Sequence, residues 1–325
     1  MVRKKNEAIP RVSMPDVDYE YTNISSLAQY ITTRPGLVDS KEPCKLITMP
    51  SKNASVTVAL RSDDGVALSR SITQYDATVM DAVYSLFING CVRFTPEMVA
   101  RMISGRLEGC ISPQKIGAVS KSLNKLRHVD ITIDLTDEYI KTGGILEPGE
   151  RITKTSYLLP LEVYNAVIPD NGKKLKTKET KDGDEIIAGY EFIKRPVLYT
   201  YAESKGEIEQ FPTKLLSAAK MSDTDDNIAI KWYLIRRIGA LKKARNKTIL
   251  KDVIYYDTEE RQGAFKDLSF FEENFANWRE KKKKIHTSFV KVLDAYKEEE
   301  YIKDYTVLYE GKSPIGIEIQ ISSEY

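Results

Sequence analysis

The sequence predicts an α+β protein with two winged-helix domains in tandem and an N-terminal arm. The prediction depends on one pattern that occurs twice: a basic helical segment that runs into strand-like apolar residues. Residues 112–127 form the first helical segment, and residues 129–135 alternate after it. Residues 278–296 form the second, and the strand-like residues 305–308 and 315–321 follow. A helix-turn-helix unit with a β wing has this order, and its second helix enters the major groove of DNA.

Composition fits a globular protein that is large enough for two domains. The chain has 325 residues, of which 42% are hydrophobic and 30% charged. It has no run of about 18 apolar residues, and the charged residues 1–16 lack an apolar core, so we expect neither a membrane span nor a signal peptide. Cys44, Cys91 and Cys110 show no CxxC pairing. We therefore expect reduced thiols, a cytoplasmic location and no zinc site.

We expect the chain to divide into an arm and two domains. Residues 1–43 are polar with few periodic signals, which predicts a mobile arm with a short helix near residues 25–32. The first winged-helix domain, with an extended wing, is expected over residues 44–213, and the second over residues 214–325. The segment 210–226 indicates the linker between them.

Three helices and then a strand are expected early in the first domain. The first helix runs from about Asp76 to Asn89. The next two begin at Thr95 and Ser112, because each of these N-cap residues is followed by a proline at the first helical position. Gly105 ends the second helix. In the rest of this domain, the sequence predicts strands at residues 157–164 and 190–201.

A polar, lysine-rich excursion at residues 170–184 indicates either a long wing or a surface insertion. In the second domain, apolar spacing predicts a helix of about four turns from near Asp226 and a short helix at residues 249–256. Ser269 opens an S-x-x-E capping box before a long helix. A hairpin that turns at residues 310–312 is expected to follow it.

The sequence contains no catalytic or metal-binding pattern. It has no P-loop, GxGxxG or HExxH motif, and its only histidines are His128 and His286. His128 is expected at a helix C-terminus, where it interacts favourably with the helix dipole. His286 is expected on the polar side of the basic helix, where a solvent or phosphate contact suits it. We therefore expect no enzyme, no cofactor and no metal.

Three groups of basic and polar residues are candidate DNA contacts. The first group lies on the helical segment 112–127. The second is residues 231–251, which hold eight bases and no acid. The third includes residues 281–284, which are four consecutive lysines. Glutamine and asparagine suit adenine, lysine suits guanine, and lysine or arginine suits phosphate. For all three groups the alternative interpretation is a solvated helix face. The candidates are Gln114, Lys115, Lys121, Asn124, Lys125, Arg236, Arg237, Lys242, Lys243, Lys281, Lys283, Lys284, Thr287 and Lys291.

The chain resembles the replication initiator proteins of theta-replicating plasmids, which are built from two winged-helix domains. The resemblance covers roughly residues 66–321. It rests on residues 75–80, which open the first helix, and on the helices at 112–126 and 285–296, which precede strands. It implies that the C-terminal domain reads repeated origin sites on double-stranded DNA. It also implies an N-terminal domain that dimerises or makes a second DNA contact, and host replication proteins as partners. The chain departs from the family pattern by its long excursion at 136–187.

Two other classes of function stay open. One is a transcriptional repressor with the same modules and no replication role, and the other is a partner-binding protein without a DNA role. Repeated sites beside the gene's own replication region would favour the initiator, and a single palindrome in a promoter would favour the repressor. An absence of salt-dependent DNA binding would favour the partner-binding protein.

Overall fold

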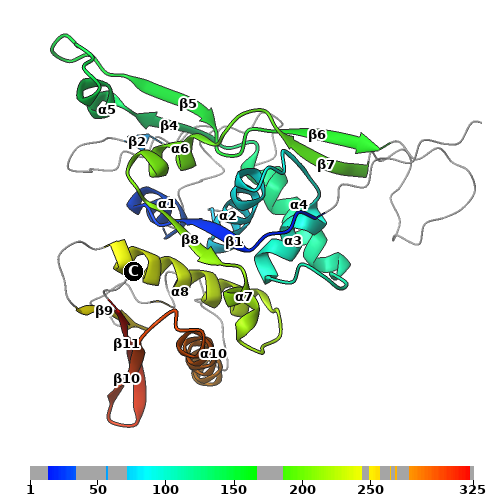
Figure 1. The fold of residues 1–325 in the computed structure, drawn as a ribbon, viewed down its shortest axis with the longest axis vertical. Coiled ribbons are helices and arrows are strands. Elements are labelled where there is room, and N and C mark those ends of the chain that lie inside the picture. Colours follow the sequence, from blue (N-terminus) through cyan, green and yellow to red (C-terminus); the bar gives the residue numbers. More distant parts are fainter. Residues whose placement is uncertain are drawn as a thin grey trace, which may run out of the picture.

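The computed structural model describes residues 14–33, 56–57, 72–166, 186–243, 249–256, 264, 268 and 278–322. The chain is an α+β protein in which short sheets are packed against helices (Figure 1). In chain order, its first elements are β1 (Tyr19–Asn23), α1 (Ser26–Thr33), β2 (Val56–Thr57), α2 (Gln74–Ile88), β3 (Arg93–Phe94), α3 (Pro96–Ser104), α4 (Pro113–Leu126), β4 (Asp130–Asp134), α5 (Thr136–Lys141), β5 (Thr153–Tyr157), β6 (Leu161–Ala166) and β7 (Ile186–Phe192). The later elements are α6 (Val197–Ser204), β8 (Ile208–Pro212), α7 (Lys214–Ala218), α8 (Asp225–Lys243), β9 (Ile249–Tyr255), α10 (Trp278–Glu298), β10 (Asp304–Glu310) and β11 (Ser313–Ser322).

The helices α3 and α4 begin at the predicted N-caps, and α2 begins at Gln74, close to the predicted start at Asp76. Thr73 and Asp76 form a reciprocal capping box before α2. The side chains of Thr95 and Ser112 each accept a backbone N–H from the first turn of their helix, and each is followed by proline. Gly105 ends α3 with a positive φ of 64°. The three predicted helices are therefore confirmed. They could be predicted because each capping signal lies within one turn of the helix start.

The described part of the chain contains four antiparallel sheets. Their strand orders are β1-β8, β2-β4-β5, β3-β7-β6 and β10-β11-β9. The first helical block, α2 to α4, leads directly into β4, as predicted. The last sheet begins with β9, which lies between α8 and α10 in the sequence, and ends with the β10–β11 hairpin (Figure 1).

The predictions of a mobile arm and of a linker are wrong for the described residues. β1 pairs along its whole length with β8, from Tyr19 opposite Pro212 to Asn23 opposite Ile208. α1 confirms the short helix, but Val17, Leu27 and Ile31 are buried in the core. On the other side, α7 lies inside the predicted linker 210–226. These segments are short and partly polar, so their apolar residues give too weak a periodicity to show that they are buried.

The end of α3 and the start of α7 are in close contact. A Cβ added to Gly105 would lie only 2.6 Å from the Cβ of Leu216. Phe211, Leu215 and Leu216 are all buried. Residues 211–216 therefore belong to the core, where α7 also packs against α8 and α10, rather than to an exposed connection.

Three further strand and helix assignments need correction. The predicted strand 190–201 is β7 followed by α6, because Leu198, Tyr199 and Ala202 bury one helical face, although the β-branched and aromatic residues of this segment favour a strand. The predicted strand 157–164 is interrupted before Leu161 and forms parts of β5 and β6. The predicted short helix 249–256 is β9, which gains a partner in β11. The lysine-rich excursion 170–184 and the capping box at Ser269 lie outside the described residues.

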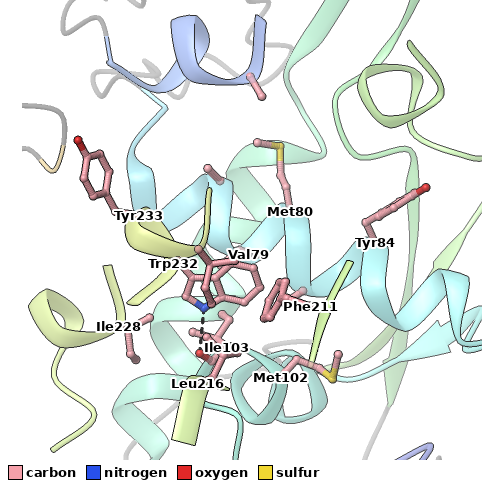
Figure 2. Packing of buried hydrophobic residues seen from close by; sticks show 14 of the residues in the cluster. Val79, Met80, Tyr84, Met102, Ile103, Phe211, Leu216, Ile228, Trp232 and Tyr233 are labelled. Atoms are coloured by element: carbon pink, nitrogen blue, oxygen red, sulfur yellow. Dashed lines mark hydrogen bonds between the residues drawn. The ribbon is translucent and has the colours of Figure 1, made fainter. Parts of the chain in front are cut away.

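Helix α8 lies at the centre of the molecule. It packs against α2, β1, β8 and α7 on one side and against β9, β11 and α10 on the other (Figure 1). The indole of Trp232 is fully buried, lies perpendicular to the ring of Phe211 at 5.4 Å, and donates a hydrogen bond to the carbonyl of Ile103 at 3.1 Å (Figure 2). The division into residues 44–213 and 214–325 stays a prediction, and α8 contacts elements on both sides of it.

Candidate nucleic-acid interface

Helix α10 has one buried face and one basic face. Ile285, Phe289, Leu293 and Tyr296 are buried. The hydroxyl of Tyr296 donates to the backbone carbonyl of Lys231 at 3.2 Å, which attaches α10 to α8. These contacts fix the rotation of α10 about its axis and leave its opposite face in solvent.

The exposed face of α10 carries most of its predicted DNA contacts. Lys284, Thr287 and Lys291 follow one another at spacings of three and four, so they form one stripe, and Lys283 lies beside it. Within the described part of the chain, Lys283, Lys284 and Lys291 make no ion pair. Lys281 is half-buried. An uncompensated positive stripe on a helix attracts phosphate.

The β10–β11 hairpin follows α10 in the chain. Its turn contains Gly311, which has a positive φ of 58°, so the predicted turn at residues 310–312 is confirmed. β11 is the middle strand of its sheet, because β9 pairs with its other edge. The hairpin is thus joined to the rest of the protein through β9 and α8.

The outer face of α4 is less basic than the sequence predicts. Lys115 lies 3.7 Å from the carboxylate of Asp223, and Lys125 forms an ion pair with Asp76. The exposed candidates on α4 are Gln114, Lys121 and Asn124. Asn124 accepts a hydrogen bond from the side chain of Arg127 at 2.9 Å.

Arg236 is a correction to the predicted DNA contacts. Its side chain is buried in the core, where its guanidinium donates to the carboxylate of Asp81 at 2.8 and 3.1 Å. It also donates to the side chains of Gln74 at 3.0 Å and Thr78 at 3.2 Å. The side chain is therefore held between α8 and α2 and does not reach a DNA surface.

The neighbouring bases of α8 also contact the protein itself. Arg237 pairs with Asp252 of β9 at 2.5 Å. The ammonium of Lys242 lies 3.8 Å from the ring centre of Tyr301, and burial lowers the pKa of Lys242. Lys243 donates to the backbone carbonyls of Gly206 and Ile208 at 2.8 and 2.5 Å. The structure thus does not gather residues 231–243 into a basic patch.

One sequence signal could have revealed the burial of these bases. Residues 228–238 of α8 place apolar side chains on every face of the helix, and Ile228, Ile230, Trp232, Leu234 and Ile235 are all buried. A helix that is apolar all round is a central helix. Basic residues within it therefore have a high chance of internal partners, whatever the local charge.

The two histidines have structural partners. A ring nitrogen of His286 lies 2.7 Å from the hydroxyl of Tyr256, and burial lowers the pKa of His286. A ring nitrogen of His128 lies 2.7 Å from the carbonyl of Asn124. The described residues contain no cluster of His, Cys, Asp or Glu that could hold a metal. Among the described helices, none is both long and apolar enough to cross a membrane.

The comparisons with known proteins identify similar structures but no family. No protein-family model and no curated protein matches the sequence. The chain is similar to a crystal structure of RctB domains 2–3, with a TM-score of 0.51 and 12% identity, over 92% of this chain and 97% of that one. A crystal structure of selenomethionine derivatives of domains 2 and 3 of RctB has a TM-score of 0.48 and 12% identity, over 92% and 96% of the two chains. At this identity the likeness concerns the fold.

Proposed function

We propose that this chain is a DNA-binding protein of the replication-initiator type, in which α10 is the principal reading helix. The observation that carries the proposal is the exposed lysine face of α10, directly before the β10–β11 hairpin. A reading helix followed by a β wing is the docking element of a winged-helix module. In this interpretation α10 enters the major groove and the hairpin lies along the DNA backbone.

The element order supports two such modules. The second consists of α8, β9, α10 and the β10–β11 hairpin, with β9 against β11. The first consists of α2, α3 and α4 followed by β4 and β5, with α4 as its reading helix. The likeness of the fold to RctB domains 2–3 extends over nearly the whole chain, which agrees with two modules in one architecture.

The initiator role itself rests on the resemblance of the sequence to plasmid initiators. It implies repeated origin sites on double-stranded DNA, an N-terminal domain that dimerises or makes a second DNA contact, and host replication proteins as partners. The protein acts by binding and without catalysis. Of the residues predicted to contact DNA, the proposal retains Gln114, Lys121 and Asn124 on α4, and Lys281, Lys283, Lys284, Thr287 and Lys291 on α10.

DNA affinity is expected to fall steeply as salt rises. Each neutralised phosphate contributes a slope of roughly −0.9 to log K against log salt. With the bases of α8 held inside the protein, we expect only about three to five phosphate contacts by the same rule. Fluorescence anisotropy on duplexes from the region that flanks the gene, between about 50 and 200 mM salt, measures the slope. A flat response would overturn the proposal.

Replacement of Lys283, Lys284 and Lys291 by alanine is expected to weaken DNA binding without unfolding the protein. The lysines are exposed and repel one another, and alanine has the better helix propensity, so the free energy of unfolding should change by less than about 0.5 kcal/mol. Affinity should fall on the order of tenfold to a hundredfold, and the salt slope should decrease by about two to three.

A matched variant with the same loss of charge controls for net charge. Lys194, Lys205 and Lys214 are exposed on or beside α6 and α7, outside both proposed modules. Their replacement by alanine should change the salt slope by less than about 0.5. Equal losses in the two triple variants would mean that α10 has no special role.

A further inference from the structure

A positively charged cleft lies beside the turn between α3 and α4. Its volume is about 340 Å³. It is enclosed by the segment after α3, by α7, by the connection from α7 to α8, and by α8 itself. The residues that line it are Arg106, Ser217, Ala219, Lys220, Met221, Asp223 and Lys231.

The carboxylate of Asp223 in this cleft lies near three positively charged side chains. The carboxylate oxygens of Asp223 lie 2.8 Å from Nε of Arg106, 3.7 Å from Nζ of Lys115 and 3.8 Å from Nζ of Lys231. Lys220 adds a fourth positive charge to the lining. Four positive charges around one negative charge leave a local excess of positive charge, which favours a second anion.

The floor of the cleft is formed by a buried ammonium group. The side chain of Lys231 is 2% exposed, donates a hydrogen bond to the carbonyl of Leu216 at 2.6 Å, and interacts with the carboxylate of Asp223. Burial lowers the pKa of Lys231, and the charges of Arg106 and Lys115 lower it further against the attraction of Asp223. An ammonium group has three donors, so Lys231 can donate to an oxyanion in the cleft as well.

The entrance to the cleft presents flexible basic groups. The side chain of Arg106 is 55% exposed, and Lys220 is exposed. Within the described residues, the terminal nitrogens of Arg106 make no hydrogen bond, because only its Nε faces Asp223. A guanidinium binds phosphate oxygens through two parallel N–H groups. Lys115 belongs to the first turn of α4, whose aligned backbone dipoles also favour an anion.

We propose that this cleft binds one phosphate group, and that the phosphate belongs to the backbone of the DNA read by α4 and α10. The proposal rests on the proposed DNA-binding function and adds a phosphate contact to it. α3 packs against α4 and α7, and α7 packs against α10, so the cleft lies among the helices that join the two reading helices (Figure 1). A phosphate there relieves the mutual repulsion of the four bases and places the DNA backbone next to the start of α4.

The test removes the two exposed bases and keeps the buried groups. The variant Arg106→Gln with Lys220→Gln should fold, because both side chains reach solvent. Its salt slope on duplex DNA should be lower than that of the unchanged protein by about one, and its affinity lower by about fivefold to tenfold on all sequences. The control Lys194→Gln with Arg195→Gln removes an exposed lysine and an exposed arginine just before α6, outside both proposed modules, and should change neither.

A second measurement uses inorganic phosphate as the probe. The thermal unfolding temperature is compared in phosphate and in chloride at equal ionic strength, because a ligand that binds the folded state raises it. Phosphate should stabilise the unchanged protein and the control variant, and it should not stabilise the Arg106 and Lys220 variant. A variant that keeps both the full salt slope and the phosphate effect overturns the proposal.

The two measurements separate this proposal from the proposed function. If the unchanged protein binds DNA and the variant loses only the phosphate effect, the cleft is a site for a free phosphorylated compound, and the DNA source is overturned. If the unchanged protein does not bind DNA but phosphate stabilises it through Arg106 and Lys220, the proposed function fails and the phosphate site stands.

Discussion

Replacement of Asp81 by alanine is expected to lower the free energy of unfolding by about 3–5 kcal/mol, because it leaves the buried guanidinium of Arg236 without its counter-ion. Both side chains lie almost completely inside the protein, with 2% and 8% exposure. The carboxylate of Asp81 also accepts hydrogen bonds from the hydroxyls of Tyr199 and Thr22, each at 2.6 Å.

Urea unfolding followed by circular dichroism measures this loss. The control is the double variant Asp81→Ala with Arg236→Met, which removes both charges and should be less destabilised than Asp81→Ala alone. If Asp81→Ala changed the free energy of unfolding by less than about 1 kcal/mol, the buried pair would not hold α2 and α8 together.

Replacement of Trp232 by alanine is expected to cost a similar amount, about 3–5 kcal/mol, through the loss of apolar contacts and the cavity that remains. The indole is fully buried in α8, and it packs against Phe211 of β8 (Figure 2). It also makes the hydrogen bond to the carbonyl of Ile103 at the end of α3. One side chain therefore joins three elements that are far apart in the sequence.

Replacement of Trp232 by phenylalanine separates the two contributions. Phenylalanine keeps most of the apolar volume but leaves the carbonyl of Ile103 without this donor, so a loss of about 1–3 kcal/mol is expected. Thermal and urea unfolding of both variants give the comparison. Equal stability of the alanine variant and the unchanged protein would be incompatible with a central position for this side chain.

The sequence predicts the helices better than the sheets. Helix caps act within one turn, whereas strand pairing joins residues that are far apart in the sequence. Thr95 and Ser112 start their helices because the N-cap oxygen and the following proline act within one turn. The sequence predicts a short helix in place of β9, because so short a segment does not distinguish a helix from a strand whose partner, β11, lies far along the chain. Pairing with β11 decides its conformation, and that contact does not show in the segment itself.

The candidate DNA contacts divide in the same way. The lysines of α10 were predicted from a helix with a clear apolar face, which places its basic residues in solvent. The bases of α8 were predicted from local charge alone. Arg236 shows why this fails: its acidic partner, Asp81, lies on α2, far along the chain, and no window around residues 231–243 contains it. Asp223, the partner of Lys231, lies closer, in the connection before α8.

The central position of α8 fixes the distance between the elements that pack on its two sides. α8 packs against α2 above it and α10 below it, and Arg236 and Trp232 attach it to α2 and α3. The two proposed reading helices, α4 and α10, are therefore joined by packed elements and not by a flexible linker. On B-DNA, which turns once in about 10 base pairs, they would select two sites that face the same side of the duplex at one separation. The number of base pairs between those sites then becomes part of the recognised sequence, even where no side chain touches a base.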